Sequence, residues 1–144
     1  MCDVIIKKQP CGCKDYLELR VAFGDLNNCQ LKCPFCFTLG QKPDYVKLSS
    51  LTTRITPDIK VVRFTGGEPL LNQNQVNGMI RELRKIEEMN LNHIDLIVIQ
   101  TNAISVASLD IDEFFEFELP ILFEVSFKGT NSKEYRYLTF QNPI

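Results

Sequence analysis

The sequence predicts an α/β protein built on about four parallel strands. Short runs of β-branched and aromatic residues recur along the chain, and the stretches between them carry apolar residues at helical spacing. This alternation is typical of βαβ units. The 144 residues suffice for one domain with a hydrophobic core, and the 44% hydrophobic and 24% charged residues are ordinary for a soluble globular protein.

The four predicted strands cover residues 16–23, 61–64, 96–101 and 121–127. Each has one apolar and one partly polar face, because successive side chains point to opposite sides of a strand. The apolar face of the last strand carries Phe123, Val125 and Phe127. The polar faces carry Glu18, Arg20, Arg63, Thr65, Gln100, Asn102, Glu124, Ser126 and Lys128. We expect a curved sheet whose polar, concave side lines a wet or ligand-filled cavity near the carboxyl ends of the strands. The alternative is an open sheet with one solvated face.

Helices are expected between these strands. Apolar residues at helical spacing predict the longest one, between the second and third strands: Val76, Met79, Ile80, Leu83 and Ile86. Asn72 or Asn74 is expected to cap its start. A shorter helix is expected to begin near Ser108 and to end before Pro120, because proline cannot continue a helix. Residues 49–55 are expected to hold another short helix.

The charge of the chain excludes some classes of partner. A net charge of −2 gives no general attraction to nucleic acid or to an anionic membrane. No apolar run approaches the roughly 18 residues that a membrane-spanning helix needs. Charges at Asp3, Lys7 and Lys8 are unlike the apolar segment of a secretory signal peptide. We therefore expect a cytoplasmic protein without a membrane or nucleic-acid partner.

Three cysteines follow the first predicted strand on one short loop: Cys29, Cys33 and Cys36. Thiolates are soft ligands that suit iron–sulfur clusters and zinc. Three converging thiolates can hold three corners of a cube-shaped cluster and leave its fourth iron open, as the open position of catalytic zinc sites illustrates. The spacing therefore predicts a metal centre on these three residues.

Other interpretations of the cysteines remain open. The triplet could be buried and reduced without a metal, or it could bind zinc with His93, Cys11 or Cys13 as the fourth ligand. Cys2, Cys11 and Cys13 could form an auxiliary metal site, or belong to an N-terminal hairpin with free thiols. All six cysteines lie in the first quarter of the chain, which favours a metal centre over simple packing.

A glycine-rich turn follows the second predicted strand, with the sequence Thr65, Gly66, Gly67, Glu68 and Pro69. Two glycines at the end of a strand allow the backbone to approach a ligand closely. The Glu68 carboxylate could accept a hydrogen bond from an ammonium group, and Pro69 stiffens the exit of the turn. We predict that these five residues bind a cofactor; the alternative is an ordinary turn with a solvated Glu68.

With these two motifs in this order, the chain resembles the radical S-adenosylmethionine (SAM) superfamily. The cysteine triplet matches that family's CxxxCxxC loop, including an aromatic residue at Phe35, and the Gly-Gly-Glu-Pro segment matches its GGEP motif. Asn102 resembles the Thr-Asn ending of the third strand. Ser126 and Lys128 occupy positions on the fourth strand where family members often carry polar residues. The resemblance covers roughly residues 17–144.

The resemblance implies a partial TIM-type barrel. About four parallel strands of it would lie in residues 16–144, after a cysteine-containing segment over residues 1–15, and the barrel would be truncated at the C-terminus. The family's fifth and sixth strands, which help to hold adenine and close the cavity, would be missing. The fourth strand would then be an exposed edge. We expect a partner chain or self-association to cover this edge; alternatively, the chain is a cluster-binding remnant or subunit without turnover of its own.

The resemblance also implies a [4Fe–4S] cluster and SAM as cofactors. The three cysteines would hold the cluster, its open iron would bind the amino and carboxylate groups of the methionine part, and the edge from Gly66 to Glu68 would receive the methionine ammonium. Reductive cleavage of SAM would give a 5′-deoxyadenosyl radical, which would abstract hydrogen from an unknown substrate. The electron would come from a reduced donor such as flavodoxin or ferredoxin.

Further roles follow from the same resemblance. Phe35 would pack near the adenine, and Asn102 and Ser126 would contact the ribose or the carboxylate. The candidates for the substrate side, which could otherwise pair with one another across the sheet, are Arg20, Arg63, Glu124 and Lys128. The tail, with Lys128-Gly129-Thr130 and Tyr135, resembles the subgroup that contains the glycyl-radical-enzyme activases.

Overall fold

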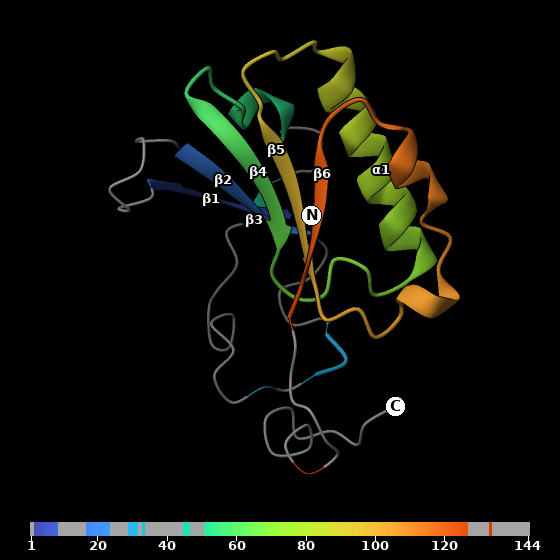
Figure 1. The fold of residues 1–144 in the computed structure, drawn as a ribbon. Coiled ribbons are helices and arrows are strands. Elements are labelled where there is room, and N and C mark those ends of the chain that lie inside the picture. Colours follow the sequence, from blue (N-terminus) through green and yellow to red (C-terminus); the bar gives the residue numbers. More distant parts are fainter. Residues whose placement is uncertain are drawn as a thin grey trace.

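The computed structural model describes residues 2–8, 17–23, 29–31, 33, 45–46, 51–126 and 133. These residues contain a six-stranded sheet with the order β3-β1-β2-β4-β5-β6 (Figure 1). The strands are β1 Cys2–Lys8, β2 Leu17–Phe23, β3 Tyr45–Val46, β4 Ile59–Thr65, β5 Leu96–Thr101 and β6 Ile121–Val125. Neighbouring strands from β2 to β6 are parallel, whereas β1 is antiparallel to both β2 and β3.

The predicted fold class is confirmed. β2, β4, β5 and β6 correspond to the four predicted strands, and the bounds of β5 agree at both ends. Such a four-stranded parallel sheet with connecting helical segments is consistent with a fragment of a (βα) barrel. The hydrophobic pattern could predict these strands because β2, β4 and β5 bury apolar residues in the core, while β6 packs Ile121 and Phe123 partly against it and leaves Val125 exposed.

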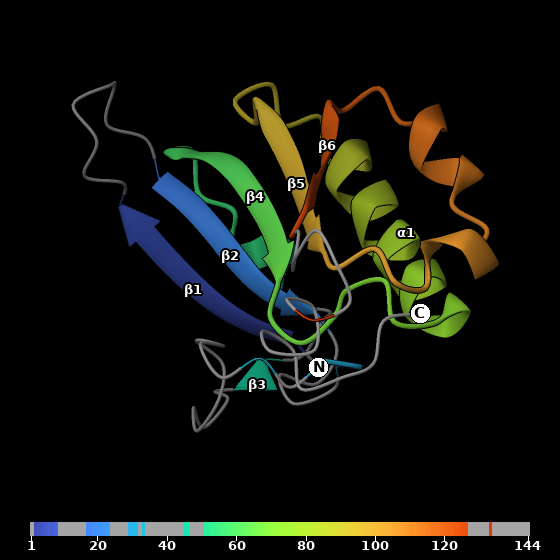
Figure 2. The same ribbon diagram turned by 60° about the horizontal axis from the view of Figure 1, so that its bottom comes forward.

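β1 and β3 are two strands that the sequence analysis did not predict. β1 pairs with β2 over its whole length, from Cys2 opposite Phe23 to Lys8 opposite Leu17. Figure 2 shows the two strands side by side, pointing in opposite directions. The assignment of residues 1–15 to a separate segment stays a prediction, although β1, which lies within these residues, belongs to the same sheet as β2.

The predicted long helix is confirmed as α1, Gln73–Glu88. Asn72 rather than Asn74 caps it, because the Asn72 side chain accepts a hydrogen bond from the Gln75 N–H at 2.9 Å. All five predicted core residues of this helix are buried. In the described part of the chain, no helix has the length and apolar character needed to span a membrane.

The shorter predicted helices differ from expectation, because they are 3₁₀ turns. They are η2 Thr52–Arg54, η3 Val106–Ser108 and η4 Asp112–Glu116. The segment near Ser108 is divided by contacts to α1: the Gln73 side chain accepts from the Asp110 N–H at 2.8 Å and donates to the Asp110 carbonyl at 3.1 Å. These bonds satisfy the Asp110 backbone outside a helix, so one continuous helix does not form.

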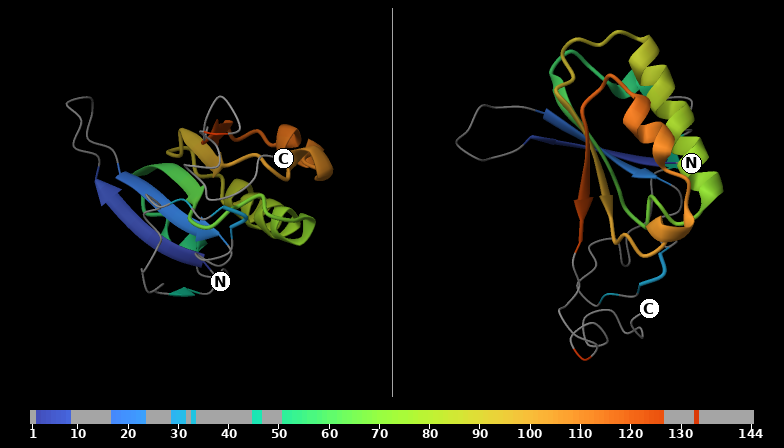
Figure 3. Two further views of the ribbon diagram at one scale, coloured as in Figure 1. Left: turned by 90° about the horizontal axis from the view of Figure 1, so that it is seen from below. Right: turned by 45° about the vertical axis from the view of Figure 1, so that its right-hand side comes forward.

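The hydrophobic core lies on one side of the sheet. Figure 3 shows α1 and the segment around η4 on that side. The core is centred on the inward residues of β2, β4 and β5 and on α1; Phe23 and Phe64, for example, pack edge to face with ring centroids 5.8 Å apart. Four of the polar residues predicted for the opposite side share a face, as the ion pairs of Glu18, Arg20, Arg63 and Glu124 show. That this face lines a cavity stays a prediction.

Candidate cofactor site

Two loops meet where β4 and β5 end. Adjacent parallel strands finish at the same edge of a sheet, and the β4–β5 register sets Phe64 opposite Ile99. One residue further along each strand, the Thr65 hydroxyl donates a hydrogen bond to the Gln100 side-chain oxygen at 3.1 Å. In Figure 1 both arrows end at the bottom, directly above the blue trace of residues 29–31. The edge therefore gathers the glycine turn, the end of β5 and part of the cysteine loop.

The turn after β4 depends on its two glycines. Gly66 has φ 69° and Gly67 has φ 60°, both in the left-handed region that strains residues with a side chain. Two successive residues of this kind reverse the chain sharply between β4 and Glu68. A side chain at either position would strain the turn and fill the space beside its backbone. The conformation of the turn therefore accounts for both glycines, and close approach to a ligand stays a prediction.

The Glu68 carboxylate faces the protein interior, with only 2% of the residue exposed. It accepts hydrogen bonds from the Leu70 N–H at 3.0 Å, from the Asn102 N–H at 2.8 Å and from the Thr101 hydroxyl. The backbone carbonyl of Glu68 accepts from Gln75 Nε2 at 2.7 Å. The alternative of a solvated Glu68 is thus wrong. The side chain ties the glycine turn to the end of β5, and its contact with an ammonium group stays a prediction.

Burial raises the pKa of Glu68 above its ordinary value, while the hydrogen bonds from Asn102, Thr101 and Leu70 oppose the rise. Because the folded protein holds this proton more tightly than the unfolded chain, the stability that Glu68 contributes is complete below the unfolded pKa of 4.5. It decreases as the pH rises through the folded pKa.

Glu68→Gln is expected to destabilise the protein by about 1–3 kcal/mol at acid pH, because both oxygens of the protonated acid can still accept, whereas the amide places an NH₂ group against one of the donors. The variant cannot titrate at this position. Urea unfolding at several pH values should therefore show that the difference in free energy of unfolding between wild type and variant becomes smaller as the pH rises. Glu88→Gln, on the exposed side of α1, is the matched control and should leave the pH profile unchanged. A gap that widens with rising pH would contradict the raised pKa.

Cys29 and Cys33 provide the described part of the predicted metal centre. Cys29 is half-buried and Cys33 is 7% exposed. The Cys29 Sγ accepts from the Leu31 N–H at 3.4 Å and from Asn102 Nδ2 at 3.6 Å. Two N–H donors directed at one sulfur suit a thiolate ligand, so the donor chemistry fits an iron–sulfur cluster.

The completeness of this ligand set rests on a residue that the structure does not describe. Cys36 and its neighbour Phe35 lie outside the described residues. Among the described ones, no three His, Cys, Asp or Glu side chains gather closely enough to hold a metal ion. His93 therefore does not join Cys29 and Cys33 as a zinc ligand group. The cysteine triplet itself stays a prediction.

Asn102 contacts both motif loops. Its backbone N–H bonds to Glu68, and its side-chain Nδ2 donates to the Cys29 Sγ and, at 3.2 Å, to Gln30 Oε1. Gln30 Nε2 in turn donates to the Ser105 hydroxyl at 2.7 Å. The sequence analysis missed Gln30 and Ser105, since nothing in their local pattern indicates a partner about 75 residues away. The one available signal was position, because Gln30 directly follows Cys29 and Ser105 lies in the loop after β5.

The polar face of the sheet carries an ion-pair network. Glu18, 1% exposed, accepts from Arg20 Nε at 2.6 Å and from Arg63 Nε at 3.0 Å; Arg63 Nη1 also pairs with Glu124 at 2.8 Å. Burial lowers the pKa of Arg63, but hydrogen bonds and charge attraction from the two carboxylates outweigh it and leave the pKa raised. The alternative of mutual pairing across the sheet therefore holds for Arg63 and Glu124, whereas Arg20 pairs with Glu18 on its own strand, and contact with a substrate stays a prediction.

The remaining predicted residues are placed only in part. The Ser126 N–H donates to the Thr101 carbonyl at 2.8 Å, so the Ser126 backbone lies beside the end of β5. Lys128 and Tyr135 lie outside the described residues. The subgroup indicated by the tail therefore stays a prediction.

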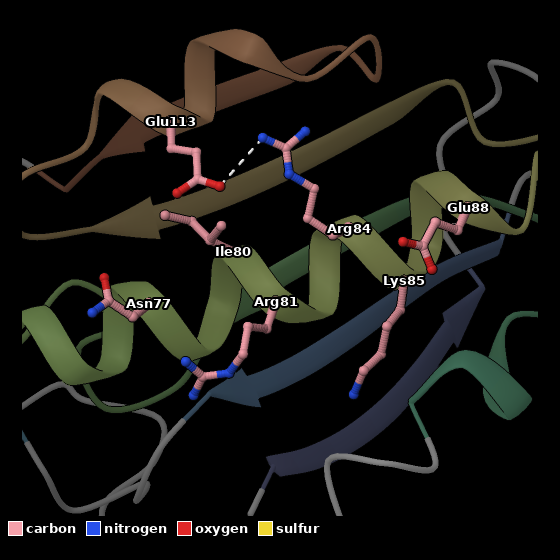
Figure 4. A pocket seen from close by; sticks show the side chains of 7 residues that line it. All are labelled: Asn77, Ile80, Arg81, Arg84, Lys85, Glu88 and Glu113. Atoms are coloured by element: carbon pink, nitrogen blue, oxygen red, sulfur yellow. Dashed lines mark hydrogen bonds and ion pairs between the residues drawn. The ribbon is translucent and has the colours of Figure 1, made fainter.

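A shallow depression of about 550 Å³ lies over the outer face of α1 (Figure 4). Its rim includes the ion pair between Arg84 Nη2 and Glu113 at 3.3 Å. It is lined by Asn77, Ile80, Arg81, Arg84, Lys85, Glu88 and Glu113. None of these belongs to the cysteine or glycine motif, so we assign the depression no part in cofactor binding.

Comparison with known proteins gives one informative similarity. No family model matches the sequence. The chain is 34% identical over 86 residues to a GTP 3′,8-cyclase from Petrotoga mobilis; the match covers 52% of this chain and 24% of the relative. The chain thus spans about a quarter of the length of that protein. GTP 3′,8-cyclase belongs to the radical SAM enzymes, so the similarity supports a distant relationship to that superfamily and no particular subgroup.

Proposed function

We propose that this chain is a radical SAM protein that holds a [4Fe–4S] cluster on Cys29, Cys33 and Cys36 and binds SAM beside the glycine turn. One observation carries the proposal: Asn102 contacts the Cys29 Sγ and the Glu68 carboxylate at once. Two motifs far apart in the sequence therefore lie at one edge of the sheet. The distant similarity to GTP 3′,8-cyclase supports the same superfamily.

The chemistry would come from the cofactors. When bound, such a cluster supplies the electron for reductive cleavage of SAM, and the resulting 5′-deoxyadenosyl radical abstracts a hydrogen atom from the substrate. A reduced donor such as flavodoxin or ferredoxin would deliver that electron.

The chain itself positions these groups and limits access of water. Leu31 and Cys33, 8% and 7% exposed, keep the described part of the cysteine loop away from solvent. Gly66 and Gly67 present side-chain-free backbone to the methionine part of SAM, and Glu68 fixes that backbone against β5. The face with Arg20 and Arg63 continues from this edge and would meet the substrate.

The similarity covers too little of its relative to carry over that protein's activity. We therefore propose no substrate. The proposal is limited to the cluster, SAM and the reductive cleavage that they perform together.

The test is electron paramagnetic resonance (EPR) on the anaerobically reconstituted, reduced chain, with and without SAM, alongside iron, sulfide and zinc analysis. A reduced-cluster signal that shifts on addition of SAM is expected, because SAM binds the open iron. A signal that ignores SAM would contradict the SAM site and leave a cluster-binding subunit. Zinc in place of iron and sulfide would overturn the proposal.

A further inference from the structure

We propose that Asn102 is a positioning residue for the cluster: its amide donates a hydrogen bond to the Cys29 sulfur and raises the reduction potential there. This inference rests on the proposed function. It assigns Asn102 a different role from the expected SAM contact, because both hydrogens of its amide nitrogen already have partners, the Cys29 Sγ at 3.6 Å and Gln30 Oε1 at 3.2 Å.

The orientation of the Asn102 amide is fixed by its surroundings. Its Oδ1 accepts from the Ile104 N–H at 3.0 Å, while its Nδ2 faces two acceptors, the Cys29 Sγ and Gln30 Oε1. A flipped amide would place its NH₂ group against the Ile104 N–H. It would also place its oxygen against the Cys29 Sγ and Gln30 Oε1. Each of these contacts is repulsive, so the NH₂ group is held toward the sulfur.

The backbone beneath this amide is also held firmly. The Asn102 N–H bonds to Glu68 at 2.8 Å, and the Ala103 N–H bonds to the Thr101 hydroxyl at 2.9 Å. Ala103 has φ 60°, in the left-handed region that favours glycine, so the surrounding bonds stabilise a strained turn. Strain of this kind is typical of turns that fix a functional side chain.

Gln30 completes the arrangement from the cysteine loop. Its Oε1 accepts from Asn102 and its Nε2 donates to the Ser105 hydroxyl at 2.7 Å. The Gln30 amide is therefore oriented at both ends and links the loop with Cys29 to the turn after β5. Losing this link would loosen the loop without removing a ligand.

Hydrogen bonds to cysteine sulfurs are one of the terms that set the potential of an iron–sulfur cluster. A reduced cluster carries one more negative charge, part of it on the sulfurs, and an N–H donor stabilises that charge. The Asn102 donor therefore favours the reduced cluster. Its removal should make the midpoint potential more negative.

The experiment is an EPR-monitored redox titration of the reconstituted full chain without SAM. Asn102→Ala removes the donor, and Asn102→Asp replaces it with a negative charge while keeping an acceptor for the Ile104 N–H. Both variants are expected to load iron and to show a more negative midpoint potential, with the larger shift for Asn102→Asp. The matched control is Asn77→Asp on the exposed side of α1, which should titrate as wild type.

Gln30→Met provides a second variant that leaves Asn102 in place. It should shift the potential in the same direction but less, and it decides the question if the Asn102 variants do not fold. Loaded variants with the wild-type potential would overturn this inference and leave the proposed function standing. A wild-type chain that takes up no cluster would overturn both.

Discussion

Cys33→Ala is expected to abolish stable cluster incorporation into this chain. A [4Fe–4S] cluster with an open iron depends on all three of its thiolates, so the loss of one leaves a second iron without its ligand. Loss of a ligand should weaken cluster binding by more than the roughly 10–100-fold loss of metal affinity that follows removal of a residue that only hydrogen-bonds to a ligand. The reconstituted variant should therefore contain little iron and sulfide. Iron and sulfide analysis after anaerobic reconstitution, together with the absorption spectrum, measures it.

Two comparisons separate this effect from simple misfolding. Cys33 is buried, and Cys33→Ala removes one sulfur, so the metal-free variant should lose only about 1 kcal/mol of stability and keep its circular dichroism spectrum. Cys11→Ala, outside the triplet, should load iron as wild type. Equal loss of iron in both variants would contradict the assignment of the cluster to Cys29, Cys33 and Cys36 and point to a site that includes the N-terminal cysteines.

Arg63→Met is expected to lower the free energy of unfolding by about 3 kcal/mol. Removal of one partner from a buried ion pair costs roughly 3–5 kcal/mol, because it leaves an uncompensated charge, and Arg20 moderates the loss here. Glu18 is 1% exposed and would keep only Arg20, and Glu124 would lose its Arg63 contact. Urea unfolding of the metal-free chain measures this change.

The matched control is Arg81→Met on the exposed outer face of α1, where a change within about 0.5 kcal/mol is expected. The double variant Glu18→Gln/Arg63→Met should recover part of the stability, because it removes the buried Glu18 charge, and Arg20, which loses its carboxylate partner, is 27% exposed and reaches water. An Arg63→Met variant as stable as the Arg81→Met control would show that the network contributes little and that Arg63 is retained for another reason.

The parts of the fold that the sequence predicted are those with a local pattern. The apolar run of β5, buried from Ile97 to Ile99, and the helical spacing of Val76 to Ile86 in α1 both reflect burial, and such patterns are visible in a single segment. The missed strand β1 is different. Its short apolar run is bounded by charges, and it became a strand because β2 offered an edge along its whole length.

The candidate site shows the same division. The spacing of the cysteines and the Gly-Gly-Glu-Pro turn could be recognised in the sequence, and the parallel fold explains why such loops lie at one edge. The sequence could not show that Glu68 points inward, since a carboxylate is buried only where donors such as the Thr101 hydroxyl and the Asn102 N–H await it. Nor could it choose between a substrate and Glu18 as the partner of Arg63.

By itself, then, the sequence determined the parallel α/β framework and the location of the two motifs at strand ends, because both follow from patterns within short segments. Only the tertiary structure decided which polar groups pair. The contact of Asn102 with Cys29 joins residues 73 positions apart. Such partners depend on how strands and loops are brought together in space, and no local pattern records that.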